Sequence, residues 1–211
     1  MKRSKTYVPE EYKPSTHEVL GCLSSESQWL KLLKGRNKPY ENLLTDLEMH
    51  FDKMLWNGDY KYSVSGLSEK FGIKAPHFVK WVHQIYNDIF ELNSYEPDLF
   101  ESDGIRHFLH FTCLDSFVGF TLWLKTPLHH DESFDWFFLR AKLRLTFFFI
   151  DKVSHEFSNG EQLTSVYLVS GFPNLYQRFI QDKALFYNKI RLSEFRSQSD
   201  LEDRLKQLYP Q

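Results

Sequence analysis

Cysteine is scarce in this sequence: there are two, Cys22 and Cys113, and they lie far apart. Secreted scaffolds held by disulfides need more cysteines at closer spacing, so the pattern favours two reduced thiols in a cytoplasmic protein. No stretch approaches the roughly 18 consecutive apolar residues that indicate a transmembrane helix. The basic residues near the first methionine precede no apolar run, which does not fit a secretory signal. The sequence therefore predicts a cytoplasmic protein with no membrane partner.

A large charge of one sign is also missing. The formal net charge is −2 with the nine histidines counted neutral, so nucleic-acid binding would have to depend on a local basic patch. The sequence contains no phosphate-binding glycine-rich loop and no GxGxxG, GxSxG or HExxH motif. No set of residues proposes a reaction, so no cofactor is expected and an enzyme is the less favoured class.

Aromatic residues are abundant: they make up 17% of the chain and include 20 phenylalanines, enough to build a large core and to argue against wholesale disorder. Most must be buried, because so many rings cannot all stay in contact with water. Aromatic rings on an exposed sheet can stack nucleobases, as in RNA-binding domains, but no basic-glycine-aromatic signature accompanies these rings. The surplus would line a ligand cavity or a homo-oligomer interface. The rings of this region are Phe108, Phe111, Phe117, Phe120, Trp123, Trp136, Phe137, Phe138, Phe147, Phe148 and Phe149.

Composition and periodicity divide the chain into four segments. Residues 1–38 are polar and broken by prolines, which predicts an extended or partly disordered arm. Within it, the apolar group at residues 29–33 indicates a short helix that docks elsewhere. Residues 39–93 have helical periodicity and predict a three-helix domain. Residues 94–104 predict a linker, and residues 105–211 predict about five antiparallel strands followed by C-terminal helices. The predicted fold class is therefore α+β, with a helical domain preceding an antiparallel-sheet domain.

The stretch from Val64 to Trp81 predicts a helix, a tight turn and a second helix. Leu67 and Phe71 are four residues apart, as one face of a short helix requires. Gly72 follows where a helix-ending residue with positive φ is wanted, and Pro76 suits the first turn of the next helix. Residues 64–82 resemble the helix-turn-helix of DNA-binding proteins such as phage repressors and transposase-type DNA-binding domains. The resemblance covers less than a tenth of the chain.

This resemblance implies binding of duplex DNA through the second helix, whose apolar stripe leaves one polar side. Lysines on that side can neutralise phosphates, while a histidine and a glutamine can reach base edges. The predicted function is a DNA-binding transcriptional regulator or an accessory factor of a mobile element or plasmid. The alternative is a protein-interaction or assembly protein in which the helix pair is structural. The candidate contact residues are Lys74, His77, Lys80 and Gln84.

The predicted sheet contains one strong local signal and one candidate polar pair. Asn159-Gly160 between apolar-rich runs predicts a type I′ hairpin, with Phe157 opposite Gln162. Simple alternation along the preceding strand would place Asp151 and His155 on one face, together with residues 147, 149, 153 and 157. The pair is a candidate for ligand contacts, although a hydrogen-bonded structural role is favoured.

Two further patterns give weaker predictions. His107, His110 and Cys113 suggest metal ligands on paper, with His129 and His130 further on. In a strand, however, residues 107 and 113 would point to one face and residue 110 to the other, so no metal site is predicted. Residues 199–202 read Ser-Asp-Leu-Glu, a capping box that predicts the start of the last helix.

Overall fold

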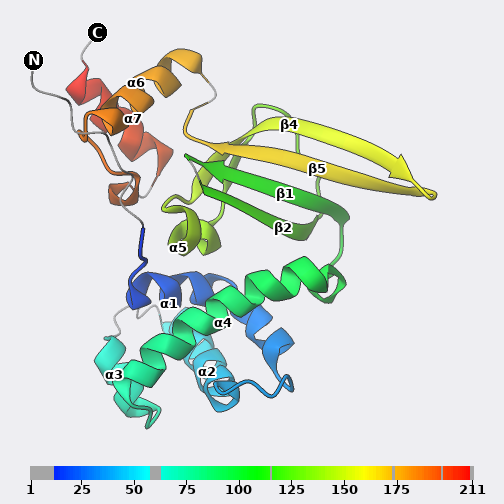
Figure 1. Cartoon of the computed structure of the whole chain (residues 1–211), viewed down its shortest axis with the longest axis vertical. Helices are drawn as coiled ribbons and strands as arrows, with labels where there is room; N and C mark the ends of the chain where they lie inside the picture. Colours follow the sequence, from blue (N-terminus) through cyan, green and yellow to red (C-terminus); the bar gives the residue numbers. More distant parts are fainter. Residues whose placement is uncertain (1–11, 58–62, 115, 173, 196, 210–211) are drawn as a thin grey trace, which may run out of the picture.

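The computed structural model describes residues 12–57, 63–114, 116–172, 174–195 and 197–209, and it combines a helical layer with a curled sheet (Figure 1). The helical layer comes first in the chain and lies below the sheet in this view, while the last helices lie beyond one end of the sheet. The α+β class is confirmed. The helical layer consists of α1 (Thr16–Ser25), the 3₁₀ helix η1 (Ser27–Leu33), α2 (Glu41–Asn57), α3 (Val64–Lys70) and α4 (Ala75–Tyr95).

The five strands of the described residues form one sheet in the order β2-β1-β5-β4-β3. Neighbouring strands pair in antiparallel fashion except β1 and β5, which run parallel. The prediction of an all-antiparallel sheet is therefore wrong for this one pairing. Local alternation of side chains does not reveal which strand lies on which edge, so the sequence pattern could not decide it. The strands are β1 (Ile105–Cys113), β2 (Ser116–Leu124), β3 (Ser133–Asp135), β4 (Phe147–Ser158) and β5 (Glu161–Ser170).

The hairpin between β4 and β5 has the predicted register. Phe157 is opposite Gln162, and Asn159 and Gly160 have φ values of 53° and 82°, the positive values that a type I′ turn requires. A register shift between Ile150 and Lys152 marks a bulge in β4, which changes the phase of the strand. The two strands extend beyond the rest of the sheet, away from the helices (Figure 1).

One aromatic contact centre joins the helical layer to the sheet. The ring of Trp29 in η1 lies 5.4 Å from Phe100, 5.2 Å from Phe120, 5.9 Å from Trp136 and 5.1 Å from Phe138. These partners come from η2 (Pro97–Phe100), from β2 and from the segment at η3 (Phe137–Leu139). The buried side chains of the described residues thus form a cluster that includes both halves of the chain.

The expectation of an extended arm is wrong for α1, whereas the short helix expected at residues 29–33 is present as η1. Ser15 caps α1 in a capping box with Glu18: the backbone N–H of Glu18 donates to Ser15 Oγ at 3.2 Å, and the Ser15 N–H donates to the Glu18 carboxylate at 3.0 Å. Leu20 and Leu30 are fully buried. Tertiary packing orders this polar segment because its few apolar side chains all reach the core. Residues 1–11 lie outside the described residues.

The end of α4 fastens the helical layer to the edge of the sheet. The Asn93 side chain accepts a hydrogen bond from the Thr121 N–H at 2.7 Å and donates one to the Thr121 carbonyl at 2.9 Å. A side-chain amide thereby satisfies backbone groups of the edge strand β2. Phe100, within the predicted linker, is 6% exposed and packs on Phe120. This part of residues 94–104 is packed structure.

The C-terminal part folds into α5 (Arg140–Leu143) before β4, then α6 (Leu175–Phe186), η4 (Leu192–Glu194) and α7 (Gln198–Leu208) after β5. The N-cap of α7 is Ser197, whose side chain accepts from the Asp200 N–H. The predicted cap at Ser199 is therefore wrong by two residues. The Arg140 guanidinium donates to the carbonyls of Ser193 and Phe195 at 2.8 and 3.2 Å, which ties the C-terminal segment to α5.

Candidate nucleic-acid interface

Helices α3 and α4 are joined by a short turn whose geometry follows from a glycine. Gly72 has φ +66°, and its N–H donates to the Glu69 carbonyl at 3.0 Å. The next N–H, of Ile73, reaches back to the Ser68 carbonyl at 2.9 Å. This pair of bonds is a Schellman motif, which ends a helix by satisfying its last carbonyls. Pro76 lies in the first turn of α4, as its missing N–H favours.

The predicted apolar stripe of α4 is confirmed. Phe78, Val82, Ile85 and Ile89 are all fully buried, and Phe78 lies 6.2 Å from Phe71 at the turn. With these side chains inward, the opposite side of the helix faces solvent.

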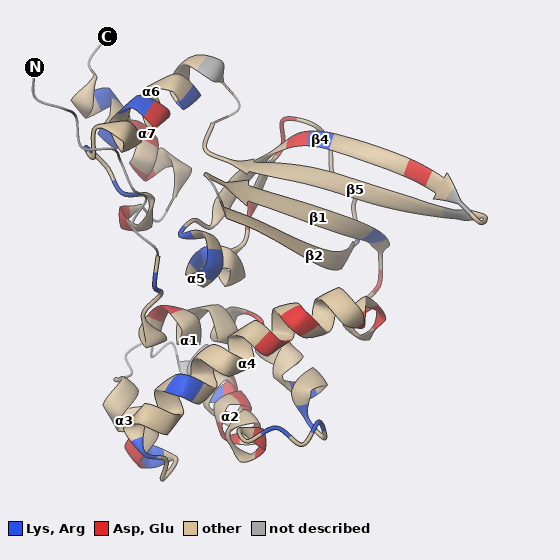
Figure 2. Ribbon diagram, in the orientation of Figure 1, with Lys and Arg blue, Asp and Glu red and all other residues tan. Residues whose placement is uncertain are grey.

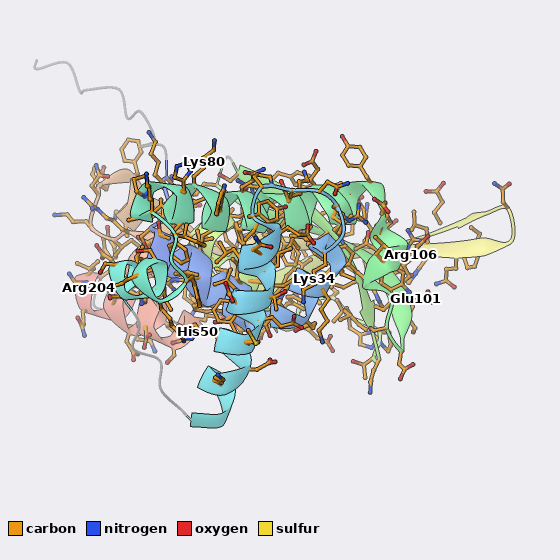
Figure 3. The ribbon with its side chains drawn as sticks, turned by 90° about the horizontal axis from the view of Figure 1, so that it is seen from below. Lys34, His50, Lys80, Glu101, Arg106 and Arg204 are labelled. Atoms are coloured by element: carbon orange, nitrogen blue, oxygen red, sulfur yellow. The ribbon has the colours of Figure 1, made fainter. Side chains whose placement is uncertain are left out.

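Three of the four candidate contact residues are exposed at the start of α4. Lys74 is the N-cap residue and its side chain makes no capping hydrogen bond, while His77 and Lys80 lie in the first two turns. Gln84 is half-buried. The spacing of three and four residues between His77, Lys80 and Gln84 brings them to one side of the helix. Figure 3 shows Lys80 on the outer side of α4, pointing away from the body of the protein.

The charge along α4 is divided between its two ends. Residues 75–87 contain no Asp or Glu, whereas Asp88 and Glu91 follow in the second half (Figure 2). Asp88 is turned inward: its carboxylate accepts a hydrogen bond from the Tyr40 hydroxyl and forms an ion pair with Lys38 at 3.2 Å. Burial and this carboxylate hold the pKa of Tyr40 well above its usual value. The exposed N-terminal half therefore presents lysine charge and the positive end of the helix dipole.

Neighbouring histidines do not add to this basic surface. His83 is half-buried and lies 3.3 Å from the Thr16 hydroxyl, and burial lowers the pKa of its ring. His50 on α2 lies 3.2 Å from the Lys70 ammonium. Burial lowers the pKa of His50, and the charges of Lys70 and Lys53 lower it further. Both rings are thus favoured in the neutral form at pH 7.

The bulge in β4 breaks the face that Asp151 and His155 were predicted to share with residues 147, 149, 153 and 157. Asp151 lies at the bulge, so Phe149 and Val153 no longer belong to the same face. His155 is exposed, and its Nδ1 lies 3.1 Å from both the Thr164 hydroxyl and the Gln162 amide nitrogen. The ring therefore has neighbours on β5, in keeping with a hydrogen-bonded strand residue.

The histidines and cysteine of β1 separate between the faces as predicted. His107 and Cys113 are buried on the inner face, and His110 lies on the outer one, stacked on Tyr167. Within the described residues, no group of three or more His, Cys, Asp or Glu side chains is arranged to hold a metal ion.

Sequence reasoning missed a cavity of about 290 Å³ between α6 and α7. Its walls are mainly apolar, and Glu202 at its edge accepts from the Gln177 amide at 3.2 Å and pairs with Lys206 at 3.1 Å. The two helices meet only through tertiary packing, so neither segment carries a signal for it. The lining residues are Phe172, Tyr176, Gln177, Ile180, Glu202, Leu205, Lys206 and Tyr209.

Comparison with known proteins adds no relative. No family model matches the chain, and neither the curated proteins nor the solved structures give a significant match. In the described residues, no helix combines the length and the apolar character needed to cross a bilayer.

Proposed function

We propose that the protein binds duplex DNA through the N-terminal half of α4. The observation that carries the proposal is the division of charge on this helix: its exposed first turns hold Lys74, His77 and Lys80, and no acidic residue precedes Asp88. DNA-binding helix pairs place the N-terminal residues of the second helix against base edges in the major groove. A basic, exposed N-terminal half is what such docking needs.

The proposal assigns two kinds of contact. Lys74 and Lys80, six residues apart, meet phosphates on either side of the groove, and His77 between them approaches a base edge. Gln84 is half-buried and therefore contributes less than the other three. Pro76 offers no donor at a usual contact position, so phosphate contacts provide most of the affinity.

The wider role that we propose is a transcriptional regulator or an accessory factor of a mobile element or plasmid. Such a protein works in the cytoplasm, and the free, buried thiols of Cys22 and Cys113 suit that compartment. The alternative remains a protein-interaction or assembly protein in which α3 and α4 serve packing.

The test is a titration of labelled duplex DNA of random sequence at several salt concentrations. Each phosphate contact contributes about 0.9 to the slope of log affinity against log salt, so Lys74→Ala/Lys80→Ala should flatten that slope by about two units. Folding should be unaffected, because both side chains are exposed and Lys74 makes no capping bond. His77→Ala should instead change the sequences recovered in a DNA selection.

The matched control is Lys125→Ala/Lys189→Ala, which removes two exposed lysines elsewhere on the surface. Its salt slope should equal that of the wild type. Equal slopes for the wild type and the α4 variant, or no binding by the wild type at low salt, would favour the protein-interaction alternative.

A further inference from the structure

The outer face of the sheet carries aromatic side chains that the core does not use. Lys152 pairs with Tyr167, Tyr167 with His110, and His110 with Gly119, which makes one row across β4, β5, β1 and β2. Directly paired residues point to the same face of a sheet. This row is therefore opposite to the buried side chains that pack against Trp29. With strands about 4.8 Å apart, it spans about 14 Å.

The rings on this face form a continuous group, which we call the aromatic platform: Phe108, His110, Phe117 and Tyr167. His110 and Tyr167 stack with centroids 4.5 Å apart and planes 5° from parallel. Phe108 and Phe117 lie 4.3 and 5.8 Å from the His110 ring. Phe117 is 61% exposed and Tyr167 is 38% exposed. Tyr167 lies between His110 of β1 and Lys152 of β4, so Phe117 is the more open ring of the platform.

Gly119 explains how these rings lie together. A Cβ atom at this position would come within 3.0 Å of the Phe108 ring and 3.9 Å of the Phe117 ring. The absent side chain leaves the surface of β2 open, and the two phenylalanines occupy the space. The outer face at this point is covered by the rings of Phe108 and Phe117.

Both cationic and acidic side chains lie near the platform. The Lys152 ammonium lies 5.5 Å from the Tyr167 ring. Further along the same face, Arg178 from α6 covers Phe149 at 5.0 Å. Arg106 covers Trp123 at 5.4 Å and forms an ion pair with Asp98 at 3.2 Å. Glu156 shares the face nearer the hairpin tip, where it is paired with Leu163.

We propose that the aromatic platform binds the unpaired bases of single-stranded nucleic acid. Sites that bind single strands combine two features: exposed aromatic rings on which bases stack, and cations that contact the backbone. The length of the row suits two or three bases, the number that sheet-based RNA-binding modules stack. Ser165, Ser154 and Thr112 supply hydroxyl groups on the same face, which also carries the aliphatic side chains of Leu163 and Val169.

This site is independent of the duplex contact proposed for α4. The bases of a duplex are stacked on one another and cannot lie on the platform, so the two sites respond to different probes. Binding of a single strand is therefore expected even if α4 binds no DNA.

The experiment measures fluorescence anisotropy of labelled 12-nucleotide strands, one of thymidine and one of uridine, at low salt. Phe117→Ala/Tyr167→Ala should weaken binding by at least about 25-fold, because each stacked base contributes at least about fivefold by alanine substitution. Lys152→Ala should lower the salt slope by about 0.7, the value for one phosphate of a single strand. The two strands distinguish DNA from RNA as the ligand.

The matched control is Phe157→Ala/Phe186→Ala, which removes two rings that are 76% and 66% exposed outside the platform. It should bind as the wild type does, and so should Lys74→Ala/Lys80→Ala. Circular dichroism checks folding, and Phe117→Ala alone carries the test if the double variant is unstable. The proposal is overturned if the wild type does not bind, or if the platform variant binds equally well. A platform variant that dissociates a dimer without losing affinity for the strands would identify a second copy as the occupant instead.

Discussion

Trp29→Ala tests whether the helical layer and the sheet share their stability. The Trp29 side chain is 9% exposed and meets rings of η2, of β2 and of the segment before β4. Alanine removes all of these contacts at once. Because the partners lie far along the chain from η1, the substitution should weaken both halves of the molecule together.

The expected cost follows from the area that the indole buries. A tryptophan buries about 150–250 Å², which at about 25 cal/mol per Å² corresponds to about 4–6 kcal/mol. This is an upper bound, since the unfolded chain already buries part of the ring. Trp→Ala changes in cores cost about 3–5 kcal/mol, which we take as the expected loss in free energy of unfolding. For a chain of this length, that loss lowers the melting temperature by about 6–20 °C.

The assay is urea and thermal unfolding, followed by circular dichroism for the helices and by aromatic fluorescence for the core. The control, Phe157→Ala, removes a ring that is 76% exposed and should change stability by less than about 0.5 kcal/mol. Trp29→Ala should shift one cooperative transition seen by both probes. A loss below about 1 kcal/mol, or two separate transitions of which one is unchanged, would refute the shared core.

Two further predictions concern the turn at Gly72 and the loss of stability at acid pH. Gly72→Val should lower the free energy of unfolding by about 1–2 kcal/mol in a urea titration, because valine is strained at the positive φ of this position. No atom lies within 4 Å of the added Cβ, so the loss would come from the backbone and not from a clash. Gly72→Asn should cost less, and equal stability of both variants and the wild type would contradict the turn. The hydrogen bond from Lys34, at 2.5 Å, lowers the pKa of Glu48. In the folded state the pKa of Glu48 lies below its unfolded-state value of about 4.3. The Glu48 carboxylate therefore contributes stability above that value, and this contribution is lost as the pH falls through the folded-state pKa. Glu48→Gln should therefore flatten the decline in stability measured between about pH 5 and pH 2, and an unchanged decline would contradict this role.

The elements that could be predicted are those whose signal is local. Asn159 and Gly160 adopt the expected positive φ values, and the register of β4 and β5 follows from that turn. The stop at Gly72 and the start at Pro76 are likewise encoded within a few residues, as is the buried stripe of α4.

The predictions that the structure contradicts concern segments whose conformation depends on residues far along the chain. Residues 16–33 have weak helical signals, and they are ordered because Trp29 finds ring partners far along the chain. The bulge at Asp151 inserts one residue into an otherwise alternating strand, which moved the following side chains to the other face.

The candidate sites show the same division. The sequence by itself determined the α3–α4 turn and the polar side of α4, since helical periodicity assigns His77 and Lys80 to the side opposite the apolar stripe. Only the tertiary structure decided which rings of the aromatic-rich strands are core and which form the platform. That choice depends on strand order: β5 inserted beside β1 brings Tyr167 against His110, two residues separated by 57 positions that no local pattern connects.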